Sequence, residues 1–294
     1  MRSDSKLSNM HSILEFNKSD AVLRAGRAAK PVSPKVADLS GLVTAALLYL
    51  ALLLTASGAL GAGPTGARPA AAMRAEKLFL TNRVRFQNDR SNVEAAWKFA
   101  RACFDWAEVA TSNEQREEIA RQGIEAARRG IARYTDSAEA HYYLAMNLGQ
   151  FAKTRGIGAL KIVHEMEHEF KTAIDLDEKL DYAGPHRSLG LLYRDAPGWP
   201  TSIGSKAKAR AELERATQLF PEHPDNRLSL AEAYAKWGER RSLQSEMDTL
   251  KGLLPKARQQ FTGEQWVANW ADWDARWEKL QRPAPEKVAP RRIR

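Results

Sequence analysis

Leu189-Gly-Leu-Leu-Tyr193 decides the fold, because the same arrangement returns downstream as Leu230-Ala-Glu-Ala-Tyr234. Each copy holds a large apolar residue, a small one, two spacers and a tyrosine. A second amphipathic stretch follows each copy and ends at a proline, and the two prolines, Pro221 and Pro255, are 34 residues apart. A fixed period of this length indicates that the chain is built from repeats.

A 34-residue unit of two helices is the signature of tetratricopeptide (TPR) repeats. The pattern extends towards the N-terminus, where Leu144-Ala145 and Phe99-Ala100 fill the large and small positions of two earlier units. The small residue allows the partner helix to approach closely, and the large residues fill the seam between the helices. We therefore predict an all-α fold, a TPR-like α-solenoid of about four helix pairs over residues 74–261.

The stretch after the last repeat, residues 262–281, contains four tryptophans at helical spacing: Trp266, Trp270, Trp273 and Trp277. They fall on one side of a helix and form a patch too large to stay in water. Thr262-Gly-Glu-Gln265 has the form of a capping box at the start of this helix. We expect a capping helix that closes the end of the solenoid, with a partner-docking face as the alternative. Residues 282–294 are typical of a disordered basic tail.

The N-terminal part contains an uncharged apolar stretch over residues 41–62. We expect a disordered basic leader over 1–40 before it and a Gly/Pro/Ala linker over 63–73 after it. About 20 apolar residues suffice to span a bilayer. The stretch is therefore either a transmembrane anchor with its N-terminus in the cytoplasm or a cleaved signal peptide, and a buried helix of the globular domain is the alternative. We expect a periplasmic or other extracytoplasmic protein, anchored in the membrane if the segment is not cleaved.

The net charge of +9 is concentrated at the two ends of the chain. Residues 1–40 carry seven basic and four acidic side chains, and residues 282–294 carry five and one. The body between them is therefore close to neutral, and we expect no nucleic-acid partner. Cys103 is the only cysteine, which excludes an intramolecular disulfide and a CxxC motif, and we expect it to be a packed core thiol.

His164-Glu-Met-Glu-His168 matches the HExxH pattern of zinc hydrolases. Both histidines nevertheless fall opposite the face that the repeat assigns to the core, and no third ligand follows at the usual spacing; the core residues of that face are Val163, Met166, Phe170 and Ala173. We therefore expect no enzyme activity, no metal and no cofactor, with a zinc-dependent hydrolase as the alternative. His141 and His186 occupy equivalent repeat positions, and we expect each to pack against the adjacent helix.

Three segments resemble the T-component (TatT-type) family of TPR-containing TRAP transporters and, more distantly, the regulator of microtubule dynamics proteins. They are residues 94–104, residues 138–146, and Tyr182-Ala-Gly-Pro-His-Arg-Ser-Leu-Gly-Leu-Leu-Tyr193 with Ala196-Pro-Gly-Trp-Pro200. The resemblance implies an exported helical protein with a groove or pore, which works beside a periplasmic solute-binding protein and holds a hydrophobic ligand.

Within this frame, the candidate ligand groove is formed by positions 5, 9 and 12 of the first helices: Tyr142, Met146, Arg187, Leu191 and Arg194. An arginine flanked by apolar and aromatic residues suits an acidic-headed apolar ligand or a peptide carboxylate. The alternative is that a neighbouring carboxylate neutralises Arg187. We expect a non-catalytic binding or scaffold protein whose partner is a protein, a peptide or a hydrophobic small molecule.

Overall fold

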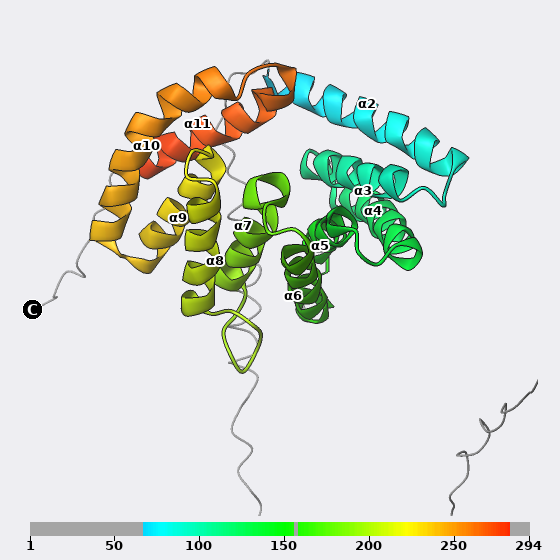
Figure 1. Cartoon of the computed structure of the whole chain (residues 1–294), viewed down its shortest axis with the longest axis horizontal. Helices are drawn as coiled ribbons and strands as arrows, with labels where there is room; N and C mark the ends of the chain where they lie inside the picture. Colours follow the sequence, from blue (N-terminus) through cyan, green and yellow to red (C-terminus); the bar gives the residue numbers. More distant parts are fainter. Residues whose placement is uncertain (1–66, 156–157, 283–294) are drawn as a thin grey trace, which may run out of the picture. The chain divides into compact units, whose positions relative to one another are not determined.

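The computed structural model describes residues 67–155 and 158–282 (Figure 1). The leader over 1–40, the apolar stretch over 41–62 and nearly all of the basic tail lie outside these residues. Among the described helices, none is both long and apolar enough to cross a bilayer. Regular structure in the described part is helical throughout, apart from an isolated bridge between Gly198 and Gly204.

The helices form four consecutive pairs, and the two members of each pair pack against each other. The pairs are α3 (Val93–Glu108) with α4 (Asn113–Arg133), α5 (Ala138–Ala152) with α6 (Ala159–Leu176), α7 (Leu180–Asp195) with α8 (Lys206–Leu219), and α9 (Pro224–Trp237) with α10 (Arg240–Gln260). The second helix of each pair also contacts the first helix of the next. This arrangement confirms the predicted TPR-like α-solenoid.

One further helix lies at each end of the repeats. Helix α2 (Ala67–Asn88) packs on α3, and α11 (Val267–Gln281) follows a short 3-10 turn, η3 (Glu264–Trp266), and packs on α9. Helices α2 and α11 also contact each other, and Arg74 lies 3.6 Å from Glu264. The first and last helices of the described part therefore meet.

The core forms where the repeat pattern places it. The small residues Ala100, Ala145 and Ala231 are fully buried, and so is Leu189 of the deciding stretch. At Gly190, a Cβ atom would lie 2.7 Å from Cγ of Leu213 in α8, so only glycine permits this approach. The same burial places Cys103 in the core and raises the pKa of its thiol, as expected for a packed cysteine.

Four helices are preceded by a polar residue whose side chain accepts a hydrogen bond from the backbone N–H three residues later. These residues are Asn92 for α3, Ser112 for α4, Ser137 for α5 and Ser205 for α8. Each bond satisfies one of the N–H groups that a helix leaves without a partner at its start. The capping residues therefore fix where these helices begin.

Glutamates on the second helices also join neighbouring repeats. The hydroxyl of Tyr193 in α7 donates to Glu167 in α6 at 2.6 Å, and that of Tyr234 in α9 donates to Glu214 in α8 at 2.9 Å. Both tyrosines are the last residue of the repeated five-residue arrangement. The recurring tyrosine thus bonds back to the preceding repeat.

Helix α7 begins with an unusual turn. Asp181, Tyr182 and Ala183 have φ values of 49°, 57° and 59°, which is the left-handed region that side chains disfavour. The right-handed helix then starts at Gly184, where a Cβ atom would lie 2.7 Å from the hydroxyl of Tyr142. Packing against α5 therefore holds a costly backbone conformation in place.

Three element boundaries differ from the prediction. Helix α2 starts at Ala67, inside the linker predicted over 63–73, because the alanines that follow are the best helix formers. Helix α10 continues past Pro255 to Gln260. The predicted capping box at Thr262 is wrong: Gly263 has a φ of 93°, and α11 begins only at Val267. Gln265 instead donates its side-chain amide to the Thr262 carbonyl at 3.0 Å.

Candidate functional site

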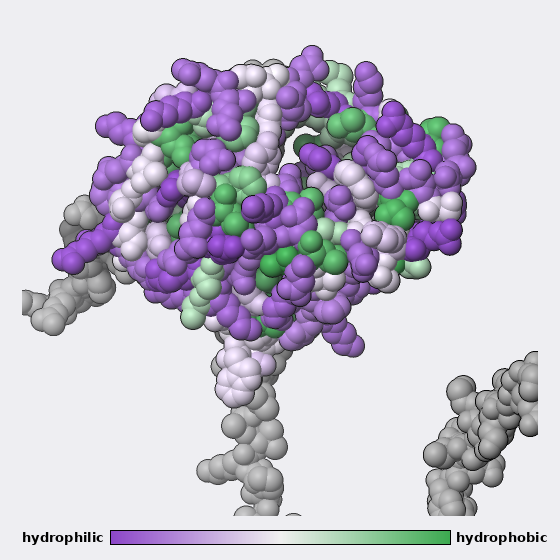
Figure 2. All heavy atoms as spheres, viewed as in Figure 1, coloured by the Kyte–Doolittle hydropathy of each residue, from purple (hydrophilic) through white to green (hydrophobic). Residues whose placement is uncertain are grey.

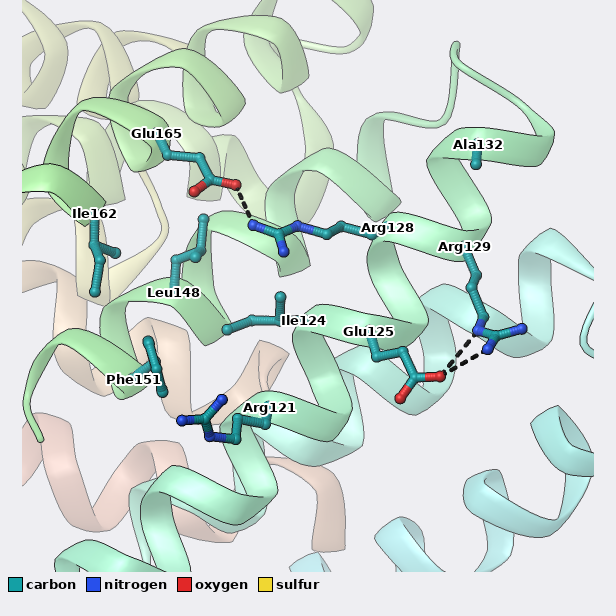
Figure 3. Close-up of a pocket in the computed structure, with 10 residues that line it drawn as sticks. All are labelled: Arg121, Ile124, Glu125, Arg128, Arg129, Ala132, Leu148, Phe151, Ile162 and Glu165. Atoms are coloured by element: carbon teal, nitrogen blue, oxygen red, sulfur yellow. Dashed lines mark hydrogen bonds and ion pairs between the residues drawn. The ribbon is translucent and has the colours of Figure 1, made fainter.

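A groove of about 500 Å³ lies between α4, α5 and α6 (Figure 3). Its floor is apolar and consists of Ile124 from α4, Leu148 and Phe151 from α5, and Ile162 from α6. The remaining lining residues are Arg121, Glu125, Arg128, Arg129, Ala132 and Glu165. The groove therefore combines an apolar floor with a charged edge, which suits a ligand that has an apolar part and a charged part.

Arginines dominate the edge of the groove. Arg128 of α4 reaches across to Glu165 of α6 at 2.7 Å, and Arg129 pairs with Glu125 along α4 at 2.9 Å (Figure 3). The guanidinium of Arg121 lies 4.8 Å from the ring centre of Phe151. Because these side chains are about half exposed, their ion pairs contribute little to stability and can exchange for a ligand's carboxylate.

This groove was not predicted from the sequence, because ligand contacts were expected on the first helices of the pairs. The sequence of α4 does contain a pattern that could have indicated part of the groove. Arg121 lies three residues before Ile124, and Arg128 lies four residues after it. Residues at these spacings share one helix face. The pattern does not reveal that Ile162 of another helix completes the floor.

The predicted groove residue Arg187 is buried and already has partners. Its Nε lies 3.2 Å from a carboxylate oxygen of Asp225, and it donates to the side-chain oxygen of Asn226 at 2.7 Å. Although burial opposes ionisation of Asp225, the guanidiniums of Arg187 and Arg276 hold the pKa of this carboxyl well below its usual range. The structure therefore shows the alternative, an arginine neutralised by a neighbouring carboxylate.

The other predicted groove residues also contact neighbours within the chain. The buried hydroxyl of Tyr142 lies 3.4 Å from Asp181, and Met146 is half-buried beside Ser188. Leu191 packs against a buried cluster formed by α8 and α9. Arg194 pairs with Asp195 at 2.7 Å and lies 3.8 Å from Glu232.

An ion-pair network connects part of this set across three helices. Arg276 of α11 lies 2.7 Å from Asp225 and 2.8 Å from Glu232, both in α9. Through these two carboxylates the network reaches Arg187 and Arg194 of α7. Helix α11 thus supplies a cation to the face on which we expected a ligand.

The four tryptophans of residues 262–281 pack mainly within the chain. Trp273 is buried and lies against His223 and Phe261, and the indole N–H of Trp270 donates to the Phe261 carbonyl at 2.8 Å. Trp266 and Trp277 are partly buried against the same cluster of α9 and α10 residues. The tryptophans therefore pack η3 and α11 onto the last repeat as a cap, over the buried residues of α9 and α10.

The HExxH residues take the positions that the repeat predicts. Val163, Met166, Phe170 and Ala173 are buried, while His164 and His168 are exposed. The two glutamates of the motif bind elsewhere, Glu165 to Arg128 and Glu167 to Tyr193. Within residues 67–155 and 158–282, no group of three or more His, Cys, Asp or Glu side chains is placed to hold a metal ion.

His141 and His186 pack against the adjacent helix, as predicted. Nδ1 of His141 lies 2.5 Å from Glu169 in α6, and Nδ1 of His186 lies 2.6 Å from Glu212 in α8. The hydrogen bond with Glu169 raises the pKa of His141, whose other ring nitrogen lies 2.9 Å from the Thr135 carbonyl. These histidines join the two helices of a repeat.

Comparisons with known proteins give one partial family match. Residues 70–190 match the model of the family described as regulator of microtubule dynamics protein 1-3, which is less than half of the chain. No curated protein matches the chain significantly. The assignment to the T-component family stays a prediction.

The solved structures that match the chain have low sequence identity and TM-scores below 0.5. A thermophilic TPR protein of Thermus thermophilus matches with a TM-score of 0.49 and 18% identity, covering 72% of this chain and 96% of its own. MamA matches with 0.44 and 19%, covering 60% and 87%. Yeast Tom70 matches with 0.24 and 12%, covering 87% and 69%. TM-scores below 0.5 at identities below 20% carry no argument about the function of this chain. From its own helix pairs and repeat pattern, the chain is a TPR-like helical-repeat protein.

Proposed function

We propose that this chain is a non-catalytic scaffold that binds a protein partner in the groove between α4, α5 and α6. The observation that supports the proposal is the combination of an apolar floor, a volume of about 500 Å³ and half-exposed arginines at the edge. The exposed His164 and His168, whose neighbouring glutamates bind other side chains, favour binding over hydrolysis.

The chemistry of the groove indicates what the partner presents. An aliphatic or aromatic side chain fits against Ile124, Leu148 and Ile162, and an adjacent carboxylate fits the guanidinium of Arg128 or Arg129. We therefore expect a peptide segment in which an apolar residue stands beside Asp or Glu. An apolar small molecule with an acidic head carries the same two groups and is the competing occupant.

We further propose that residues 41–62 anchor or export the protein, which places its partner outside the cytoplasm. The support is the length of the apolar stretch and the excess of basic residues before it. A solute-binding protein is the partner that the resemblance to transporter components favours.

The groove is tested by photo-crosslinking in the source cells, with a photoreactive residue in place of Ala132, an exposed residue of the groove lining. We expect a discrete crosslinked protein, weakened roughly tenfold by Ile162→Asp because a carboxylate then enters the apolar floor. The control Lys161→Asp changes the exposed neighbour of Ile162 and should leave the crosslink intact.

Two results would contradict the proposal. One is a crosslink of equal strength from the exposed Lys251 on α10, which lies outside the groove lining. The other is a small molecule that copurifies with the protein in native mass spectrometry and is lost in Ile162→Asp. That result would assign the groove to the competing occupant.

A further inference from the structure

Helix α2 exposes an unusual amount of apolar surface. Of the eight large apolar side chains that are exposed among the described residues, four lie on α2: Met73, Leu78, Leu80 and Val84. Met73 is 65% exposed, Leu80 is 42% exposed and Val84 is 52% exposed. Figure 2 shows green, apolar atoms interrupting the purple surface along the edge where Figure 1 draws α2.

Three of these side chains form one stripe. At 100° per residue, Met73, Leu80 and Val84 fall within about 40° of one another around the helix axis. The buried residues of the helix, Ala75, Phe79 and Phe86, fall on the opposite side and pack towards α3. Helix α2 therefore has two apolar faces, and the repeats cover only one of them.

Basic side chains accompany the outer stripe. Between residues 70 and 88, the helix carries four basic residues, Arg74, Lys77, Arg83 and Arg85, and one acidic residue, Glu76. Arg74 lies near Glu264, and the other three basic side chains leave a net positive charge. A second copy of the chain would bring the same positive charge to the stripe, so self-association is disfavoured. An anionic lipid surface complements both the apolar stripe and the charge.

The position of α2 in the sequence agrees with a lipid surface. The apolar stretch ends at Ala62, and α2 begins at Ala67. Five residue steps of fully extended chain span at most about 18 Å. If residues 41–62 are embedded in a bilayer, the first turn of α2 therefore lies close to its surface.

We infer that α2 lies in the plane of an anionic bilayer surface, with Met73, Leu80 and Val84 inserted among the lipid headgroups. This inference rests on the proposed membrane anchorage. Three side chains bind a bilayer weakly on their own, but the anchor makes the contact intramolecular and raises its effective concentration. The helix then orients the repeats with respect to the membrane.

The test uses the full chain reconstituted in vesicles of phosphatidylcholine with or without phosphatidylserine. A spin label is attached at position 84 (Val84→Cys) or, as a control, at position 251 (Lys251→Cys) on α10. Paramagnetic relaxation by a water-soluble nickel complex then measures how far each label is exposed to water. The buried Cys103 should not react with the label, which the unsubstituted chain verifies.

We expect the label at position 84 to be at least about threefold less accessible to nickel than the label at 251 in phosphatidylserine vesicles. Adding Met73→Asp and Leu80→Asp should abolish this shielding without releasing the chain from the vesicles. Equal accessibility in an anchored chain would overturn the inference alone. Release of the whole chain by alkaline carbonate would overturn the anchorage and this inference with it.

Shielding that follows the protein-to-lipid ratio, independently of phosphatidylserine, would assign the stripe to contact between two copies and would also overturn the inference.

Discussion

At the scale of single residues, Asp105 of α3 shows how the fold acts on a titratable group. Burial raises the pKa of its carboxyl to about 6, and the nearest cation, Arg101, lies as far as 4.0 Å away. The carboxylates of Asp181 and Glu108 add to the rise. Ionised Asp105 is therefore less favourable in the folded chain than in the unfolded chain.

The sign of the pH effect follows from proton binding. A carboxyl whose folded pKa lies above its unfolded value holds more protons when folded, so stability falls as pH rises from about 4 to about 6. We predict that Asp105→Asn stabilises the protein at pH 7 and that the gain disappears near pH 4. Because the side chain retains 39% exposure, solvent screening limits the gain to about 1 kcal/mol.

The measurement is urea unfolding of both proteins at pH 4 and pH 7. Asp89→Asn serves as the control, because hydrogen bonds from Ser91 lower the pKa of the Asp89 carboxyl. The sign of its pH dependence is therefore opposite. A gain from Asp105→Asn that is equal at both pH values would contradict the prediction.

Some features of single residues could be predicted from the sequence, and others could not. The burial of Leu189, the exposure of His164 and the packing of His141 all follow from one helical frame, so they could be predicted. The pairing of Arg187 with Asp225 could not, because those residues belong to different repeats and meet only through packing. The sequence reasoning stated a neighbouring carboxylate as the alternative partner of Arg187 but did not identify it as Asp225.

At the scale of elements, the left-handed turn at the start of α7 depends on close packing at one position. We predict that Gly184→Ala destabilises the protein by about 1–3 kcal/mol, because the added methyl would lie 2.7 Å from the Tyr142 hydroxyl. Gly252→Ala in α10 is the matched control, since nothing lies within 4 Å of its Cβ position. It should stabilise the helix by about 0.5–1 kcal/mol.

Urea unfolding of the two variants measures both effects. If Gly184→Ala raises the free energy of unfolding or leaves it unchanged, the turn tolerates a side chain and the close approach is not the reason for glycine.

Element boundaries show which local signals are reliable. Ser112, Ser137 and Ser205 mark helix starts because the capping bond lies within four residues of chain. The same signal failed at Thr262, since Gly263 adopts a positive φ that interrupts the box. The groove required three helices at once, and periodicity within one helix cannot show which neighbour completes it.

At the scale of the whole molecule, α11 completes the core of the last repeat. We predict that a chain ending at Phe261 loses several kcal/mol of stability, because Leu228, Leu250 and Leu254 then lose their contact with Trp273 and its neighbours. The matched control ends at Arg282, keeps α11 and should unfold at the same urea concentration as the full chain.

Urea unfolding and size-exclusion chromatography compare the two truncations. A chain ending at Phe261 that is monodisperse and as stable as the control would show that the tryptophans are not needed as a cap. That result would return them to the role of a partner-docking face.

The tyrosines that bond back to the preceding repeat have a consequence for exchanging repeats between proteins. A donor and its acceptor are encoded in different units, Tyr193 with Glu167 and Tyr234 with Glu214. Excising the unit formed by α7 and α8, or replacing it with a foreign one, therefore separates both hydroxyl–carboxylate pairs, one at each new junction. A graft that is cut between the two helices of a repeat instead keeps each glutamate with the tyrosine that follows it.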